Sequence, residues 1–160
     1  MVYTSQLPDS PPQSDITDVA NWFLSKSPLQ HKKLQKLCYY AVAWNYALLD
    51  SSLCNNDEFQ AWIHGPVRPL LYDNYKNFGW TYIPKATSDI DFGSSQDVLD
   101  FVWEVYKDYT QFQLENLTHS ELPWLEARDG YEDFERSEVV ISSKTMREFY
   151  KEMYESSQND

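Results

Sequence analysis

The sequence predicts a mainly α-helical fold: one compact helical bundle of about five to seven helices, with at most one short two-stranded β element. Apolar residues recur at helical spacing over most of the chain, and its 160 residues suit a single domain. Aromatic residues make up 16% of the sequence, beside only four glycines. Such a chain can bury a core built from large rings without disulfides or metals.

The net charge of −12 restricts the classes of partner. Nucleic-acid binding needs a basic footprint that neutralises phosphates, so neither DNA binding nor a role as a transcription regulator is expected. No run approaches the roughly 18 apolar residues of a membrane span, and the N-terminus lacks the layout of a signal peptide. Cys38 and Cys54 stand at no metal-like spacing. We expect a cytoplasmic protein with no membrane, metal or cofactor.

The N-terminal part divides into a leader and two helices. Residues 1–14 are polar, contain three prolines and show no periodicity, which indicates a flexible leader. Asp15 is the expected N-cap of a helix over residues 16–24, whose apolar residues form one stripe. Ser27 and the proline after it are typical of an N-cap and a first helical position, so a second helix is expected over residues 28–49.

The second helix is expected to be central, because apolar residues occupy most of its circumference. Positive charge gathers around its first turns in an otherwise acidic chain, at Lys26, His31, Lys32, Lys33 and Lys36. Lysines near a helix N-terminus oppose the helix dipole. Two interpretations stay open: a solvated face that pairs with the protein's own carboxylates, or a contact surface for an acidic patch on a partner.

The densest motif is AWIHGPVRPLLY, residues 61–72. Glycine tolerates positive φ and proline fixes φ, so Gly65 and Pro66 mark a tight corner. The segment before it, residues 59–63, is short and aromatic, and we expect it to be extended or a short strand.

A helical apolar pattern follows the corner. It predicts that Pro66 occupies the first turn of a third helix, which also holds Pro69 and closes at Gly79. The motif is either a structural corner alone or part of a site that His64 and Arg68 face.

The middle of the chain is expected to contain an irregular stretch, residues 80–93, and then three helices. Ser94 with Asp97 resembles a capping box and opens the helix with the clearest apolar face. That face consists of Val98, Phe101, Val102, Val105, Tyr106 and Tyr109. Thr110 caps a short helix, and Pro123 lies in the first turn of another.

The C-terminal part is expected to begin with a connection. Residues 126–138 are highly charged and should face solvent. Residues 139–141 are apolar and suit a short strand that pairs with the segment before Gly65. Ser143 is the expected cap of the last helix, and the tail should fray from residue 156 onward.

Signatures of common enzymes are missing from the sequence. It contains no nucleophile elbow, P-loop or dinucleotide-binding motif. His31, His64 and His119 lie far apart without metal-ligand spacing, and Cys38 on an apolar helix face suits an inert thiol. An enzyme is therefore not expected. The alternative from that class is a small hydrolase or ligand-binding enzyme with His64 and His119 in one pocket.

Four segments of the chain stand in an order and spacing that resemble a known family. They are VANWFL at residues 19–24, KLQKLCYY at 33–40, AWIHGPVRP at 61–69 with Tyr72, and LTHSE at 117–121 with Pro123, Trp124 and Ala127. This pattern resembles the Panacea domain, the SocA-like or GepA-like family of phage- and plasmid-associated proteins. The resemblance covers roughly residues 15–155. Cys38 departs from the pattern, because the family more often has an aliphatic residue there.

The resemblance implies a mostly helical domain that serves as the antitoxin of a toxin–antitoxin system. Such domains typically neutralise a co-encoded toxin by direct protein binding. Their toxins are diverse and include translation inhibitors related to small alarmone synthetases. One family member instead acts as an adaptor that delivers its toxin to a protease, which is the alternative function here. Toxin identity and oligomeric state are left open.

The residues expected to contact the toxin come from the matched motifs. The candidates are Lys33, Lys36, Tyr40, His64, Arg68, Tyr72 and His119. The expected structural residues are Trp62, Gly65, Pro66, Pro69 and Trp124. We expect the corner, the start of the second helix and the turn at residues 119–124 to pack near each other. Partly exposed, they would offer the aromatic and arginine anchors that dominate protein interfaces.

Overall fold

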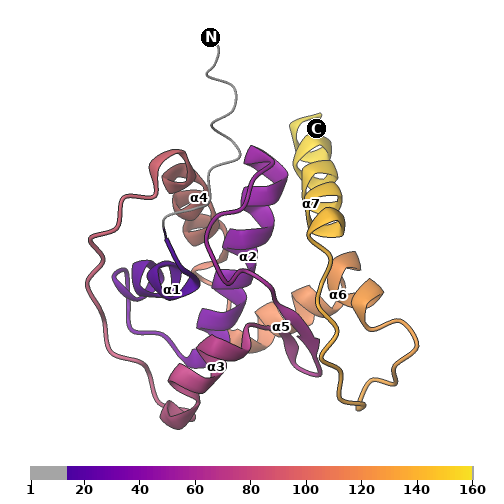
Figure 1. Ribbon diagram of the computed structural model, residues 1–160, viewed down its shortest axis with the longest axis horizontal. Helices are drawn as coiled ribbons and strands as arrows, with labels where there is room; N and C mark the ends of the chain where they lie inside the picture. The colour runs from indigo at the N-terminus through magenta and orange to yellow at the C-terminus, as the bar shows by residue number, and fades with distance from the viewer. Residues whose placement is uncertain (1–13, 160) are drawn as a thin grey trace.

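Helix α2, His31–Leu49, is the central element of the fold (Figure 1). The computed structural model describes residues 14–159, and in it α2 is buried on most of its circumference, as its sequence predicts. It packs against α1 (Ile16–Leu24), α4 (Gln96–Tyr106) and α7 (Ser143–Gln158). In Figure 1, α1 and α4 lie on one side of α2, and α7 lies on the other.

Smaller elements complete the described part of the chain. They are β2 (Gln60–Trp62), β3 (Gly65–Val67), α3 (Pro69–Tyr75), α5 (Gln111–His119), α6 (Leu122–Ala127) and the 3-10 turns η2 (Lys76–Phe78) and η3 (Gly93–Ser95). The predicted mainly α fold with one short two-stranded β element is confirmed. Of the predicted leader, only Ser14 lies within the described residues. At the other end, α7 continues past residue 156.

The predicted start of α2 is wrong by three residues. The helix begins at His31, and its N-cap Gln30 makes no side-chain cap. Leu29 exchanges two backbone hydrogen bonds with Ile83, of 3.2 and 2.7 Å between N and O. This bridge keeps the backbone extended at Leu29, so Ser27 cannot cap the helix. Its hydroxyl instead donates to the carbonyl of Pro28.

The prediction that Pro66 begins a helix is also wrong. β2 and β3 form an antiparallel hairpin in which Trp62 pairs with Gly65 and Ala61 pairs with Pro66. The turn requires a glycine at position 65, where φ is +115°. Pro66 follows in the extended strand β3 and not in a helix. The expected first-turn role belongs to Pro69 instead, which is the first residue of α3.

The predicted contact between residues 139–141 and the segment before Gly65 is confirmed as a single bridge. Val140 lies opposite Gln60. On either side, the amide of Ala61 donates to the carbonyl of Val139, and the amide of Ile141 donates to that of Phe59. The C-terminal segment therefore covers the open edge of β2.

Two predicted helix caps differ from the structure. Ser94 opens no capping box, because residues 93–95 already form the turn η3 and α4 starts after Ser95 without a side-chain cap. α7 is capped by Ser142, one residue before the predicted cap: its hydroxyl accepts from the amide of Thr145 at 3.2 Å. The cap at Thr110 is confirmed, with a full capping box to Gln113.

The predicted apolar face of α4 is confirmed in part. Val98, Val102 and Tyr106 are buried as predicted, and Leu99, which was not predicted, is fully buried beside them. Val105 and Tyr109 are exposed, and Tyr109 lies beyond the end of α4 at Tyr106.

A carboxyl group lies among tyrosines in the core. Glu121 Oε1 accepts hydrogen bonds from the hydroxyls of Tyr40 at 2.8 Å and Tyr150 at 2.9 Å. The Tyr40 ring also stacks on Tyr106, with 4.1 Å between centroids. Burial raises the pKa of Glu121, and the two tyrosine hydrogen bonds act in the opposite direction. The cluster joins α2, α6 and α7 through polar contacts inside an apolar core.

The charged connection over residues 126–138 is not wholly solvent-facing as predicted, because Arg128 is buried. Its guanidinium donates to the carbonyls of Ala61, Glu132 and Glu135 at 3.0, 2.8 and 2.6 Å. It also lies over the ring of Trp124, 5.2 Å from the centroid. Arg128 thus fastens its own loop to β2.

Candidate functional site

The hairpin corner packs on the start of α2 and on the turn between α5 and α6. Gln35 of α2 holds the backbone of Arg68: its Oε1 accepts from the Arg68 amide at 3.0 Å, and its Nε2 donates to the carbonyl at 3.2 Å. From α6, Trp124 Nε1 donates to the carbonyl of Trp62 at 2.9 Å. The expected proximity of these three segments is confirmed.

Lys36 passes under the hairpin turn at Gly65. A Cβ at Gly65 would lie 3.0 Å from Lys36 Cε and 3.2 Å from both Lys36 Nζ and Thr118 Oγ1. Lys36 is only 2% exposed. Burial lowers its pKa to about 8, although the charge of Glu115 acts in the opposite direction. The ion pairs of the described residues do not include Lys36. Glycine at position 65 therefore serves both the turn and the space that the lysine occupies.

We expect Gly65→Ala to lower the free energy of unfolding by about 2 kcal/mol, because it combines backbone strain with a steric clash. Chemical denaturation of the purified chain measures this. Gly130→Ala is the matched control: its φ is +88°, but no atom lies within 4 Å of an added Cβ, so it reports backbone strain alone. Equal losses in the two variants would refute the clash with Lys36.

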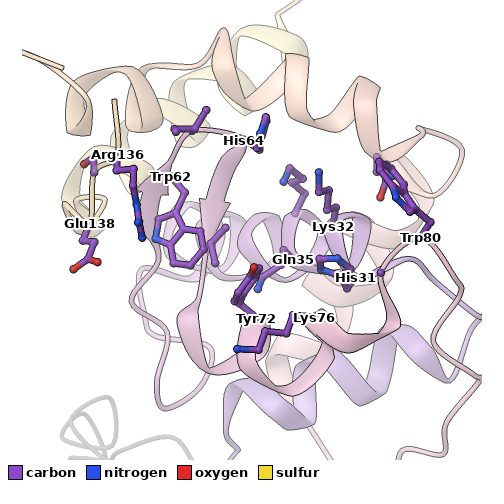
Figure 2. A pocket seen from close by; sticks show the side chains of 16 residues that line it. His31, Lys32, Gln35, Trp62, His64, Tyr72, Lys76, Trp80, Arg136 and Glu138 are labelled. Atoms are coloured by element: carbon purple, nitrogen blue, oxygen red, sulfur yellow. The ribbon is translucent and has the colours of Figure 1, made fainter. Parts of the chain in front are cut away.

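A pocket of about 520 Å³ opens beside this corner (Figure 2). Figure 2 shows His31 and Lys32 of α2 between Trp62 on one side and Trp80 on the other. Tyr72 and Lys76 line another wall. The pocket is therefore built from parts of the chain that are far apart in sequence.

The lining of the pocket is cationic. Four of the thirteen Lys and Arg residues line it, namely Lys32, Lys36, Lys76 and Arg136, but only Glu138 of the twenty-five Asp and Glu residues does. His31 also lines the pocket, and burial, with help from Lys32 and Lys36, lowers its pKa. Its Nδ1 is buried without a hydrogen-bond partner among the described residues.

Aromatic rings supply the rest of the chemistry. Tyr72 meets Trp62 edge-on, with centroids 5.1 Å apart. Two of the cations lie over rings: Lys32 Nζ is 5.5 Å from the centroid of Trp80, and Lys76 Nζ is 5.7 Å from that of Tyr72. Trp80 is 70% exposed and stands at the mouth of the pocket. The site therefore offers positive charge beside flat apolar surfaces.

The structure brings together three of the seven predicted contact residues. Lys36, His64 and Tyr72 line the pocket, as does the predicted structural residue Trp62. The His64 side chain is 63% exposed and pairs with Glu115, 3.0 Å between Nδ1 and Oε2. These residues come from α2, the hairpin turn and α3.

The other predicted contact residues lie elsewhere. Tyr40 is fully buried in the core, so we do not carry it into a contact surface. Lys33 Nζ donates to the carbonyl of Lys107, and Arg68 Nη1 donates to that of Glu58 at 3.1 Å.

His119 stacks on Trp124 with 4.0 Å between centroids, and burial lowers its pKa. It is absent from the pocket lining, whereas His64 belongs to it. The two histidines are close enough for the charge of His64 to contribute to the lowered pKa of His119, but only His64 lines the pocket. Among residues 14–159 there is no cluster of metal-ligating side chains, and no helix there is long and apolar enough to cross a membrane.

Several pocket residues were not predicted as site residues. Lys32 belongs to the basic cluster noted in the sequence, and its charge was the available signal. No feature of the sequence marked Trp80, Lys76 and Arg136 as site residues. They lie in segments that come close to α2 only when the chain folds.

Comparison with known families identifies a match over the middle of the chain. Residues 34–125, more than half of the chain, match the family model described as "Antitoxin SocA-like, Panacea domain". Comparison with curated proteins and with solved structures finds no match. The matched region includes most of α2, the hairpin, the α5–α6 turn and most of the pocket lining. The chain therefore belongs to the SocA-like antitoxin family with the Panacea domain.

Proposed function

We propose that this protein neutralises a cognate protein toxin by binding it directly. The family match carries the proposal, because it identifies an antitoxin-like domain. The stacking of His119 on Trp124, outside the pocket that His64 lines, gives the hydrolase alternative no support. An antitoxin of this kind acts through a surface rather than through catalysis.

We propose the pocket mouth as that surface, meaning His64, Tyr72, Lys76 and Trp80. Tryptophan, tyrosine and arginine dominate the binding energy of protein interfaces, and Trp80 is largely exposed here. The mouth is basic in a chain of net charge −12. Charge complementarity then favours a toxin that presents an acidic patch. Arg68, which lies between β3 and α3, is a further proposed contact.

The toxin activity to test first is inhibition of translation. The toxins that the family resemblance implies include translation inhibitors related to small alarmone synthetases. Incorporation of labelled amino acids into protein measures such an activity directly. The toxin itself is expected among the products of neighbouring genes, and it should copurify with this chain.

The pocket-mouth proposal is tested by co-expressing the toxin with Trp80→Ala. We expect loss of growth rescue and an affinity for the toxin at least about tenfold weaker, because an exposed aromatic anchor is removed. Tyr82→Ala is the matched control, since Tyr82 is 61% exposed nearby but lies outside the pocket. Full rescue by a folded Trp80→Ala variant would exclude Trp80 as a contact.

Two further measurements separate the remaining alternatives. Arg68→Ala is tested in the same assay, and unchanged rescue by the folded variant would remove Arg68 from the contact surface. Immunoblotting of the toxin distinguishes direct neutralisation from protease delivery. Direct neutralisation leaves toxin abundance unchanged during rescue, whereas delivery to a protease lowers it.

A further inference from the structure

The pocket beside the hairpin has the dimensions and chemistry of a small-molecule site. Its volume of about 520 Å³ falls within the range of roughly 300 to 1,000 Å³ that is typical of ligand pockets. We propose that it binds a small anion that carries a planar ring, a ligand of the nucleotide class. This inference does not rest on the proposed toxin binding.

Lys36 points to an anion. A buried ammonium group is costly unless an opposite charge accompanies it. Lys36 is 2% exposed, lines the pocket and makes no ion pair or hydrogen bond with the described residues. The charge of Glu115 favours the ammonium form of Lys36, but Glu115 makes its ion pair with His64 and none with Lys36. An anionic ligand in the pocket would supply a counter-charge in direct contact with Lys36.

The other cations make the preference for an anion a property of the whole pocket. Lys32, Lys76 and Arg136 line it with Lys36, against the single acid Glu138. In a chain with almost twice as many acidic as basic residues, this local excess is not a reflection of composition. The buried Nδ1 of His31, which has no partner among the described residues, adds a polar group able to bond a ligand.

The rings point to a planar group on the same ligand. Trp62, Tyr72 and Trp80 line the pocket, and two lysines already lie over the latter two rings. Any nucleobase can stack on such rings, because every base has a flat π face. A phosphate chain near Lys36 and Lys32, with a base against the rings, would use both kinds of surface.

A protein side chain is a weaker fit. A single aspartate or glutamate from a partner would neutralise Lys36 but would leave most of the aromatic lining uncovered. The volume and the three rings therefore favour the nucleotide-class ligand, and insertion of a toxin side chain becomes an outcome of the test.

The proposal is tested with the full chain by calorimetry and ligand-observed NMR, using ADP, adenosine and inorganic pyrophosphate. We expect ADP to bind at least about tenfold more tightly than either half-ligand, because it engages both the cations and the rings. Absence of ADP binding at millimolar concentration would overturn the proposal. The proposal would also be overturned if pyrophosphate bound as tightly as ADP, which would indicate a simple anion site. It would be overturned as well if adenosine bound as tightly as ADP.

Variants locate the ligand. Lys36→Met should weaken ADP binding at least about tenfold, and Trp80→Ala about fivefold. Lys85→Met and Tyr82→Ala are the matched controls, exposed and outside the pocket, and should change the affinity less than about twofold. Circular dichroism confirms that each variant is folded, and Trp80 is too exposed for its loss to unfold the chain. Unchanged ADP affinity in both pocket variants would place the ligand elsewhere. If the toxin depends on Lys36 while ADP does not bind, the pocket receives a protein side chain and the nucleotide proposal is wrong.

Discussion

Glu121→Ala is expected to lower the free energy of unfolding by about 3 to 5 kcal/mol. The substitution removes the acceptor of two hydrogen bonds, from Tyr40 and Tyr150, and leaves both hydroxyls in a buried site without this partner. It also opens a cavity between α2, α6 and α7. Urea denaturation followed by circular dichroism measures the loss.

Glu121→Gln is the matched control, because its side-chain carbonyl can still accept both hydrogen bonds. We expect most of the stability to be retained. A loss as large as that of Glu121→Ala would show that the negative charge, rather than the acceptor, holds the cluster together.

The same pair of proteins gives a pH dependence with a defined sign. Burial raises the pKa of Glu121 above its ordinary value of 4.5 in the folded state. The folded chain therefore binds more protons than the unfolded chain between that value and the raised pKa. The stability due to this proton is present below pH 4.5 and is lost as the pH rises through the folded-state pKa. The stability of the wild type relative to Glu121→Gln should thus fall as pH rises, and a rise would contradict the assignment.

Arg128→Ala is expected to lower the free energy of unfolding by about 3 kcal/mol. It removes hydrogen bonds to three carbonyls, of which the one at Ala61 belongs to a buried residue, and it removes the cation that packs on Trp124. The loop after α6 loses its fastening to β2. The rate of amide hydrogen exchange should therefore increase over residues 128–138, in addition to the increase that the lower global stability causes.

Two substitutions bracket the Arg128 result. Arg128→Lys keeps the charge but cannot reach all three carbonyls, so an intermediate loss is expected. Arg136→Ala, at an exposed position in the same segment, should change stability by less than about 0.5 kcal/mol. Equal losses of stability at positions 128 and 136 would show that the buried hydrogen bonds of Arg128 do not stabilise the fold.

The pocket and the stable core depend on the same motifs. Trp62 lines the pocket with its side chain, while its carbonyl accepts from Trp124. Gln35 lines the pocket and holds Arg68. Variants in these motifs will therefore affect folding and binding together, which is why the exposed Trp80 is the sharper probe of function.

Local sequence patterns correctly predicted several elements of the core. Helical spacing placed α2 at the centre, and Asp15 and Thr110 cap the helices that they were predicted to cap. Pro66 shows where this reasoning stops: proline suits both a first helical turn and an edge strand, and pairing with Ala61 decided between them. Ser27 lost its cap role for the same reason, because Leu29 pairs with the distant Ile83.

The helical class, the central helix and, through its motifs, the antitoxin family can be recognised from short stretches of the chain. Each depends on the spacing of residues that are close together in sequence. The burial of Lys36 and Arg128 and the exposure of Trp80 beside Lys32 could not be recognised in this way. The burial of a side chain depends on which distant segments cover it, and these are defined only when the chain folds. The cationic pocket exists only where α2, the hairpin and α3 meet.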